Sequence, residues 1–164
     1  MATNLEASLV ALEYSRHFVQ ALLDTIPEDQ LCHQPFPGAN HALWIMGHVA
    51  SVDAFLGQAC GGPQDPQLES WQPTFFMKSE PSPNPGDYPP ADEVRAWFQS
   101  TRQAVLDWFR SQDEQQLGTP LPEGLREIAP DRLSLIARLA IHEAGHGGQL
   151  TMIRKSLGLP PVFA

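Results

Sequence analysis

Two histidines four residues apart, His142 and His146, are the residues whose types and spacing best suit chemistry in this sequence. Positions i and i+4 of a helix lie on one face about 6 Å apart, so both imidazoles can bind one metal ion. Both also continue an apolar stripe, which indicates that they face the core: Leu135, Leu139, His142, His146, Gln149, Ile153 and Leu157. A buried imidazole needs a hydrogen-bond partner or a metal. The pair therefore predicts a metal site, with a metal-free polar network as the alternative.

The stretch from His142 to His146 also fits the H-E-x-x-H pattern of zinc proteases. In the commoner proteases of this kind the third ligand lies downstream, but residues 147–164 contain no Asp, Glu or His. Gln149 also replaces the glycine of the extended metzincin pattern. No strand is predicted that could hold an extended peptide beside the site. The sequence is therefore a poor fit to a protease.

A third ligand must come from upstream, where a helix predicted over residues 41–58 carries His41 and His48. These two lie on nearly one face but about 10 Å apart along the axis, so only one can join the site. His48 lies in mid-helix behind Trp44, where burial is expected, whereas His41 is expected at an exposed first turn, as a cap or in water. The remaining histidines are interpreted as structural or surface residues: His17 and His33.

The elements that must position these residues are four amphipathic helices, predicted over residues 3–26, 41–58, 91–112 and 131–157. Thr3 and Glu6 form a capping-box pattern, and Asn40 is the expected N-cap of the second helix. Gly158 ends the fourth. No alternating pattern predicts a strand. The expected fold is all-α, an antiparallel four-helix bundle forming one domain over residues 1–164.

Residues 61–90 connect the second and third helices and hold half of the 16 prolines. A connection of that length is usually either functional or disordered, and its interleaved aromatic residues favour order. We expect it to cross one end of the helices and to form one wall of the site, with some of Trp71, Phe75, Phe76 and Tyr88. Trp44 and Gln149, from the helices, are the other expected pocket residues.

Two segments, "GANHALWIMGHVASVDAFLG" and "HEAGHGGQLTMIRKSLGLPP", together resemble the DinB-like family of four-helix metal-binding proteins. This family includes bacillithiol-dependent and mycothiol-dependent transferases, and the resemblance covers most of the chain. It implies that His48, His142 and His146 bind one divalent metal with open positions for water or substrate. Gly145 and Gly147 stand where members often carry a second histidine and a basic residue, which removes groups able to support the metal or bind an anion.

The leading functional hypothesis is a transferase that joins a low-molecular-weight thiol to an electrophile on zinc, nickel or iron. A metal-dependent hydrolase of small molecules is the alternative, with Glu143 as general base. Glu143 lies about 100° around the helix from His142, and it is expected to face solvent, with the rim of the pocket as the other option. A metal-dependent binding or stress-response module without turnover is the third hypothesis.

Composition restricts the partners. The net charge is -9, from 10 Lys and Arg against 19 Asp and Glu, which argues against binding to nucleic acid. No apolar run is long enough for a membrane span. Two cysteines, Cys32 and Cys60, are too few for a disulfide scaffold, and with no signal-peptide pattern a cytoplasmic location is expected. The aromatic helix faces, and pairing among the resembled relatives, lead us to expect a homodimer.

Overall fold

The computed structural model describes residues 3–163 and is built from helices. Its α-helices are α1 (Asn4–Leu23), α2 (Ala42–Ala59), α3 (Pro66–Phe75), α4 (Ala91–Arg110), α5 (Glu114–Leu117) and α6 (Arg132–Ser156). Three 3₁₀ turns lie between them at Glu28–Gln30, Pro85–Asp87 and Glu123–Leu125. Over the described range there is no strand, only an isolated antiparallel bridge between Pro120 and Asp131. The predicted all-α class is confirmed.

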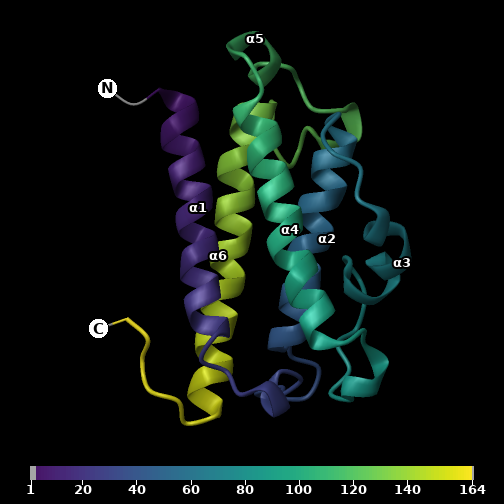
Figure 1. The fold of residues 1–164 in the computed structure, drawn as a ribbon, viewed down its shortest axis with the longest axis vertical. Helices are drawn as coiled ribbons and strands as arrows, with labels where there is room; N and C mark the ends of the chain where they lie inside the picture. Colours follow the sequence, from purple (N-terminus) through teal and green to yellow (C-terminus); the bar gives the residue numbers. More distant parts are fainter. Residues whose placement is uncertain (1–2, 164) are drawn as a thin grey trace.

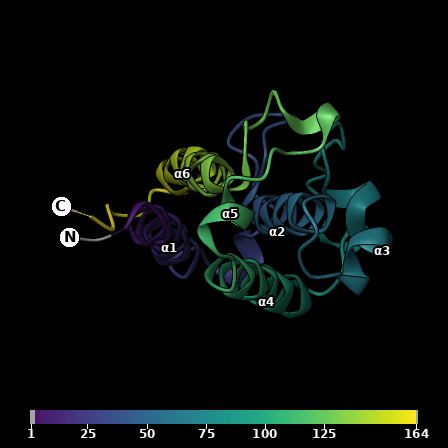
Figure 2. The ribbon, with the colours of Figure 1, turned by 90° about the horizontal axis from the view of Figure 1, so that it is seen from above.

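The four longest helices lie side by side along the long axis of the molecule (Figure 1). Helices α1 and α6 run in one direction, and α2 and α4 run in the other. Packing is most extensive between α1 and α6 and between α2 and α4. The connection from α2 to α4 therefore has to return along the molecule, and it carries α3 against the outer side of α2 (Figure 2).

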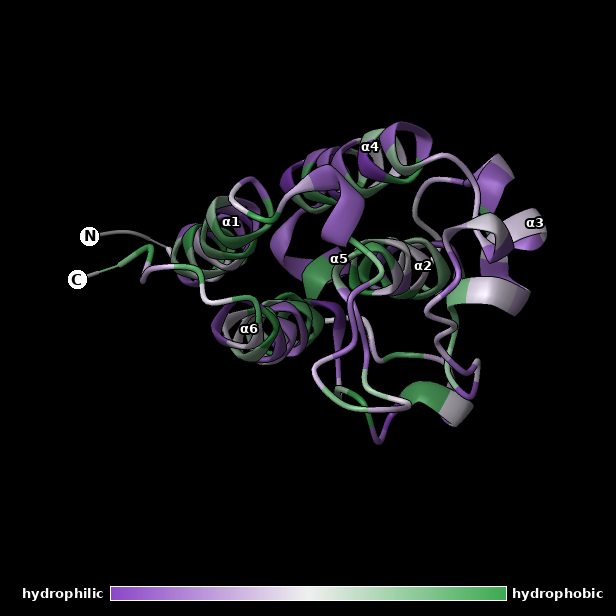
Figure 3. Cartoon of the chain, turned by 90° about the horizontal axis from the view of Figure 1, so that it is seen from below, coloured by the Kyte–Doolittle hydropathy of each residue, from purple (hydrophilic) through white to green (hydrophobic). Residues whose placement is uncertain are grey.

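Helix α2 is the most enclosed element, with α3, α4 and α6 around it in the end-on view (Figure 2). Every residue from Ala42 to Ala50 is buried, and hydrophobic residues dominate this helix (Figure 3). A helix that is apolar on nearly all sides belongs in the interior. A histidine in the middle of it, such as His48, is consequently removed from bulk water.

Hydrogen bonds at the helix N-termini agree with the sequence prediction for α1 but not for α2. Thr3 accepts a hydrogen bond from the backbone N–H of Glu6 (3.2 Å), and Glu6 accepts one from that of Thr3 (2.6 Å), as the capping box predicts. The expected Asn40 cap is wrong. His41 is the N-cap of α2, and its Nδ1 accepts from the N–H of Trp44 at 3.2 Å. Asn40 instead donates to the side chain of Gln149 at 3.0 Å, a partner that the local sequence does not reveal.

The crossover lies along the side of α2 rather than across one end of the helices (Figure 1), and it contains a helix that the sequence analysis did not predict. Helix α3 begins at Pro66 with Asp65 as its N-cap, a favourable start because proline suits the first helical turn. Pro73 inside α3 obscures the helical pattern. The last residue of α3, Phe75, is fully buried against the core. Within residues 3–163 no helix is long and apolar enough to cross a bilayer.

A group of buried charges joins α1, α2, α4 and α6, and we call it the arginine–carboxylate cluster: Arg16, Asp53, Arg102 and Glu143. Arg102 donates to Asp53 at 2.8 and 3.0 Å and contacts Glu143 at 2.7 Å. Arg16 contacts Glu143 at 2.6 Å. The expected solvent-facing position of Glu143 is therefore wrong. Its exposed fraction is 0% because two arginines from other helices neutralise it in the core.

Candidate metal centre

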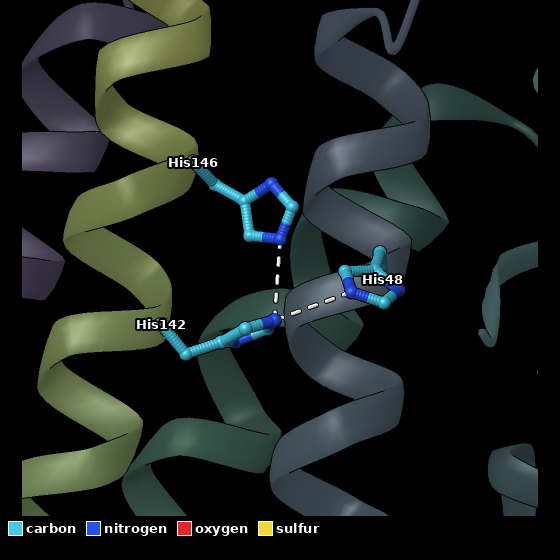
Figure 4. A group of neighbouring side chains, drawn as sticks. All are labelled: His48, His142 and His146. Atoms are coloured by element: carbon cyan, nitrogen blue, oxygen red, sulfur yellow. Dashed lines mark hydrogen bonds between the residues drawn. The ribbon is translucent and has the colours of Figure 1, made fainter.

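Three histidine side chains converge between α2 and α6 (Figure 4). His142 and His146 lie one turn apart on α6, and His48 faces them from α2. The Nε2 atom of His142 lies 3.2 Å from the Nε2 atoms of both His48 and His146. One nitrogen from each ring falls within 4.8 Å of the others, an arrangement that can hold a metal ion. The structure thus brings together the three residues that the resemblance implied as ligands.

Hydrogen bonds on the far side of two rings fix which nitrogen faces the centre. Nδ1 of His48 lies 2.8 Å from the carbonyl oxygen of Phe75, and Nδ1 of His146 lies 2.9 Å from Oε1 of Gln149. Both oxygens only accept, so each Nδ1 carries the proton and donates. In a neutral imidazole Nε2 then presents a bare lone pair. Histidine metal ligands are commonly oriented in this way.

The protons available to the three rings cannot satisfy all three inward nitrogens. A neutral His142 can donate from Nε2 to either His48 or His146, which leaves at least one lone pair directed at another nitrogen. Burial is extensive, with 6% of His48 and 9% of His146 exposed. Unpaired acceptors in such a place are costly. A divalent ion removes this mismatch, because a cation accepts all three lone pairs.

Burial also keeps the rings neutral. It lowers the pKa of His48 to about 4, with the nearby His146 adding to the effect. Burial and the charges of His146 and His48 lower the pKa of His142 to about 3. The pKa of His146 is lowered by burial as well. At neutral pH the centre therefore offers lone pairs rather than positive charge, which is the state that a metal requires.

The crossover supports His48 through the end of α3. Phe75 is the last residue of that helix, and its carbonyl belongs to the terminal group that has no partner within the helix. His48 supplies the missing donor. The approach depends on Gly47, because a Cβ atom there would lie 2.3 Å from the ring of Phe75. Glycine before the ligand thus allows α3 to pack against α2, a role that the sequence analysis did not anticipate.

Two other expected pocket residues, Trp44 and Gln149, support the histidines. The ring of Trp44 stacks on that of His48 at 4.5 Å between centroids and 10° between planes. Its Nε1–H donates to Ser79 of the crossover at 3.0 Å. Gln149 accepts from Asn40 and holds His146. These contacts link α2, α6 and the crossover around one set of ring orientations.

A cavity of about 200 Å³ opens beside the centre. Two of the histidines and a mostly apolar set of side chains line it: His48, Val52, Phe55, Leu56, Phe76, Met77, Ile128, Arg138, Leu139 and His142. The crossover borders the cavity through Phe76 and Met77. Phe75 instead packs inside the core, and Trp71 packs on Trp97 at 5.1 Å between ring centroids. The cavity is thus adjacent to the histidines and apolar along most of its wall.

The other histidines and the cysteines lie outside the centre. His41 is fully buried, so its expected exposure is wrong, although it does cap α2. Tyr88, an expected pocket residue, contacts Nε2 of His41 at 3.0 Å and is not part of the cavity wall. His17 is exposed, and His33 contacts Ser156 at 2.9 Å. Cys32 and Cys60 are buried free thiols.

The glycines around the α6 ligands differ in what they contact. A Cβ atom on Gly147 would lie 2.3 Å from the ring of Phe18, so glycine there permits α1 to approach α6 closely. Nothing lies within 4 Å of a Cβ on Gly145 or Gly148. Of these three glycines on α6, only Gly147 is required by close packing against another helix within residues 3–163.

A sequence model for the DinB superfamily matches residues 11–150, a range that contains all three histidines of the centre. No curated protein matches the chain.

Proposed function

The chain belongs to the DinB superfamily, and from this membership and the three converging histidines we propose that it is a metal-dependent enzyme on a four-helix bundle. The proposed reaction is the transfer of a low-molecular-weight thiol to a small electrophile. His48, His142 and His146 would hold one divalent ion, with zinc, nickel or iron as the candidates. The observation that carries this proposal is the set of three Nε2 atoms with too few protons to satisfy one another.

Three neutral imidazoles leave a bound divalent ion its full charge, and such an ion lowers the pKa of a thiol and so makes it a nucleophile. The chain supplies the remaining requirements. Phe75 and Gln149 hold two of the rings in place through their Nδ1 protons. Phe55, Phe76 and Met77 line the cavity beside the centre and give the electrophile an apolar surface.

The surroundings of Glu143 favour thiol transfer over hydrolysis. A hydrolase of the alternative kind needs a free carboxylate to accept a proton from water. Both oxygens of Glu143 are already bonded, one to Arg16 at 2.6 Å and the other to Arg102 at 2.7 Å and Ser15 at 3.1 Å. Glu143 therefore has no oxygen left free to accept a proton from water, and it does not line the cavity. The cavity beside the histidines provides space for a small molecule.

The test begins with the metal content of protein purified without an affinity tag, where we expect about one divalent ion per chain. The loaded protein is then mixed with a thiol and 1-chloro-2,4-dinitrobenzene, and thiol consumption is followed. His146→Ala should abolish both binding and consumption. His33→Ala is the matched control, since His33 lies outside the centre and should leave both unchanged. Thiol-independent ester hydrolysis would instead favour the hydrolase, and full metal occupancy without turnover would favour the binding module.

We further propose that the protein forms a homodimer through α1 and α6. An apolar groove runs between these helices, and its side chains include Tyr14, 73% exposed, and Ile141, 66% exposed. Exposed apolar surface of this kind is typical of interaction sites. Light scattering at micromolar concentration should give twice the mass of one chain, and Ile141→Glu should reduce it to one. A wild-type protein of single-chain mass would contradict the proposal.

A further inference from the structure

Arg138 is the one charged residue on the wall of the cavity beside the histidines. It lies on α6 four residues before His142, so the two side chains occupy the same face one turn apart. The rest of the wall, apart from His48 and His142, is apolar. An apolar pocket with a single cation selects for ligands that combine an apolar body with one negative group.

Four of the other arginines in the described part of the chain have carboxylate partners, and three hydrogen-bond to carbonyl or hydroxyl oxygens instead: Arg126, Arg132 and Arg154. Arg16 and Arg102 belong to the buried cluster, and Arg95 and Arg110 form ion pairs at the surface. Between residues 3 and 163 no ion pair involves Arg138. No hydrogen bond within this range involves Arg138 either, so this exposed arginine on the cavity wall is available to a ligand.

Arg138 lies close to the histidine centre, because Arg138, His48 and His142 line the same cavity. A group bound to Arg138 therefore lies beside the histidines. Its guanidinium presents parallel N–H donors that match the two oxygens of a carboxylate.

We propose that this cavity binds a small apolar carboxylic acid, with its carboxylate on Arg138 and its apolar body against Phe55, Phe76 and Met77. The inference rests on the proposed function, because it takes the cavity as the electrophile pocket, and it adds that the electrophile carries a carboxylate besides the group that the thiol attacks. The volume of about 200 Å³ restricts the buried part to a small group, since drug-sized ligands occupy about 300–1,000 Å³. With a single cation on the wall, a carboxylate fits better than a phosphate dianion.

The test compares two probes of nearly equal shape, 3-phenylpropanoate and the neutral 3-phenylpropanamide. Their dissociation constants are measured by calorimetry or ligand-observed NMR for metal-free and metal-loaded protein. We expect about a fivefold preference for the carboxylate in both forms, as for a partly exposed ion pair. Arg138→Gln should remove the preference. Lys155→Gln makes the same change of charge on the same helix but outside the cavity, and it should retain the preference.

Two results would overturn the inference. The first is equal affinity of the wild-type protein for both probes. The second is a preference that needs the metal and survives Arg138→Gln, because the carboxylate would then bind the ion rather than the arginine. Failure of the proposed function has a different signature. A protein without metal or thiol consumption can still show the Arg138-dependent preference, and an active protein can lack it.

Discussion

His142 and Glu143 are neighbours in the chain, yet their side chains enter two different polar groups in the same core. In the arginine–carboxylate cluster, two positive and two negative residues meet, and all four carboxylate oxygens receive hydrogen bonds. In the histidine centre, three inward nitrogens share too few protons. The difference teaches how to separate structure from function. A buried polar group that satisfies itself requires nothing further, whereas an incomplete one needs an explanation, such as a bound ligand.

The largest expected effect is on the stability of the cluster. Arg102→Met removes a buried guanidinium and leaves Asp53 and Glu143 to share Arg16. We expect a loss of about 3–5 kcal/mol in the free energy of unfolding, measured by urea denaturation of metal-free protein. The control is Arg95→Met at the surface pair with Asp24, which should cost less than about 1 kcal/mol. Equal costs for the two variants would mean that burial of the cluster has no special importance.

Removal of a histidine should affect metal binding instead. His48→Ala should weaken metal affinity more than about 100-fold, beyond the 10–100-fold typical of residues that only support a ligand. His41→Ala should leave metal affinity nearly unchanged, because His41 caps α2 and bonds outside the centre. Competition with a chromophoric chelator measures both. The reverse order would move the metal site to the start of α2.

Acid should destabilise the metal-free protein through its buried histidines. The pKa values of His41 and His48 are lowered to about 4 in the folded protein, from an ordinary 6.5. The unfolded chain therefore binds more protons between these values, so stability is full above pH 6.5 and falls as the pH drops toward 4. Each group contributes a slope of about 1.4 kcal/mol per pH unit within that range. Urea denaturation at several pH values measures the slope.

The variant His41→Asn isolates one of these contributions. Asparagine preserves an N-cap acceptor but does not titrate in this range. Below pH 6.5 the slope of the unfolding free energy against pH should therefore decrease by about 1.4 kcal/mol per pH unit, which is the contribution of one proton. An unchanged slope would show that His41 is not neutral in the folded protein.

The smallest expected effect is a difference in stability between alanine variants of two glycines on α6. Gly145→Ala should stabilise the protein by about 1 kcal/mol, because alanine favours a helix and nothing lies within 4 Å of the added Cβ. Gly147→Ala should destabilise it, since its Cβ would overlap Phe18. Thermal unfolding of the metal-free proteins compares the two. A destabilised Gly145→Ala would indicate that another chain packs on this face of α6.

Local sequence signals account for the elements and for part of the site. The prediction of a capping box at Thr3 and Glu6 is confirmed, because its two partners lie only three residues apart in the chain. The pairing of His142 with His146 follows from the pitch of one helix. His48 could be selected from its position in an apolar helix and from the resemblance to the DinB-like family. All of these depend on residues within a few turns of one another or on a family pattern.

The tertiary structure alone decided what those residues contact. Glu143 is bonded to Ser15, 128 positions away, and His48 donates to the carbonyl of Phe75, 27 positions away. Asn40 donates a hydrogen bond to Gln149, 109 positions away, and does not cap α2. A helical pattern predicts which side chains of a helix turn inward but not which element they contact there. That choice depends on how the helices pack, because the energy of a buried charge or imidazole is set by the partner that packing brings to it.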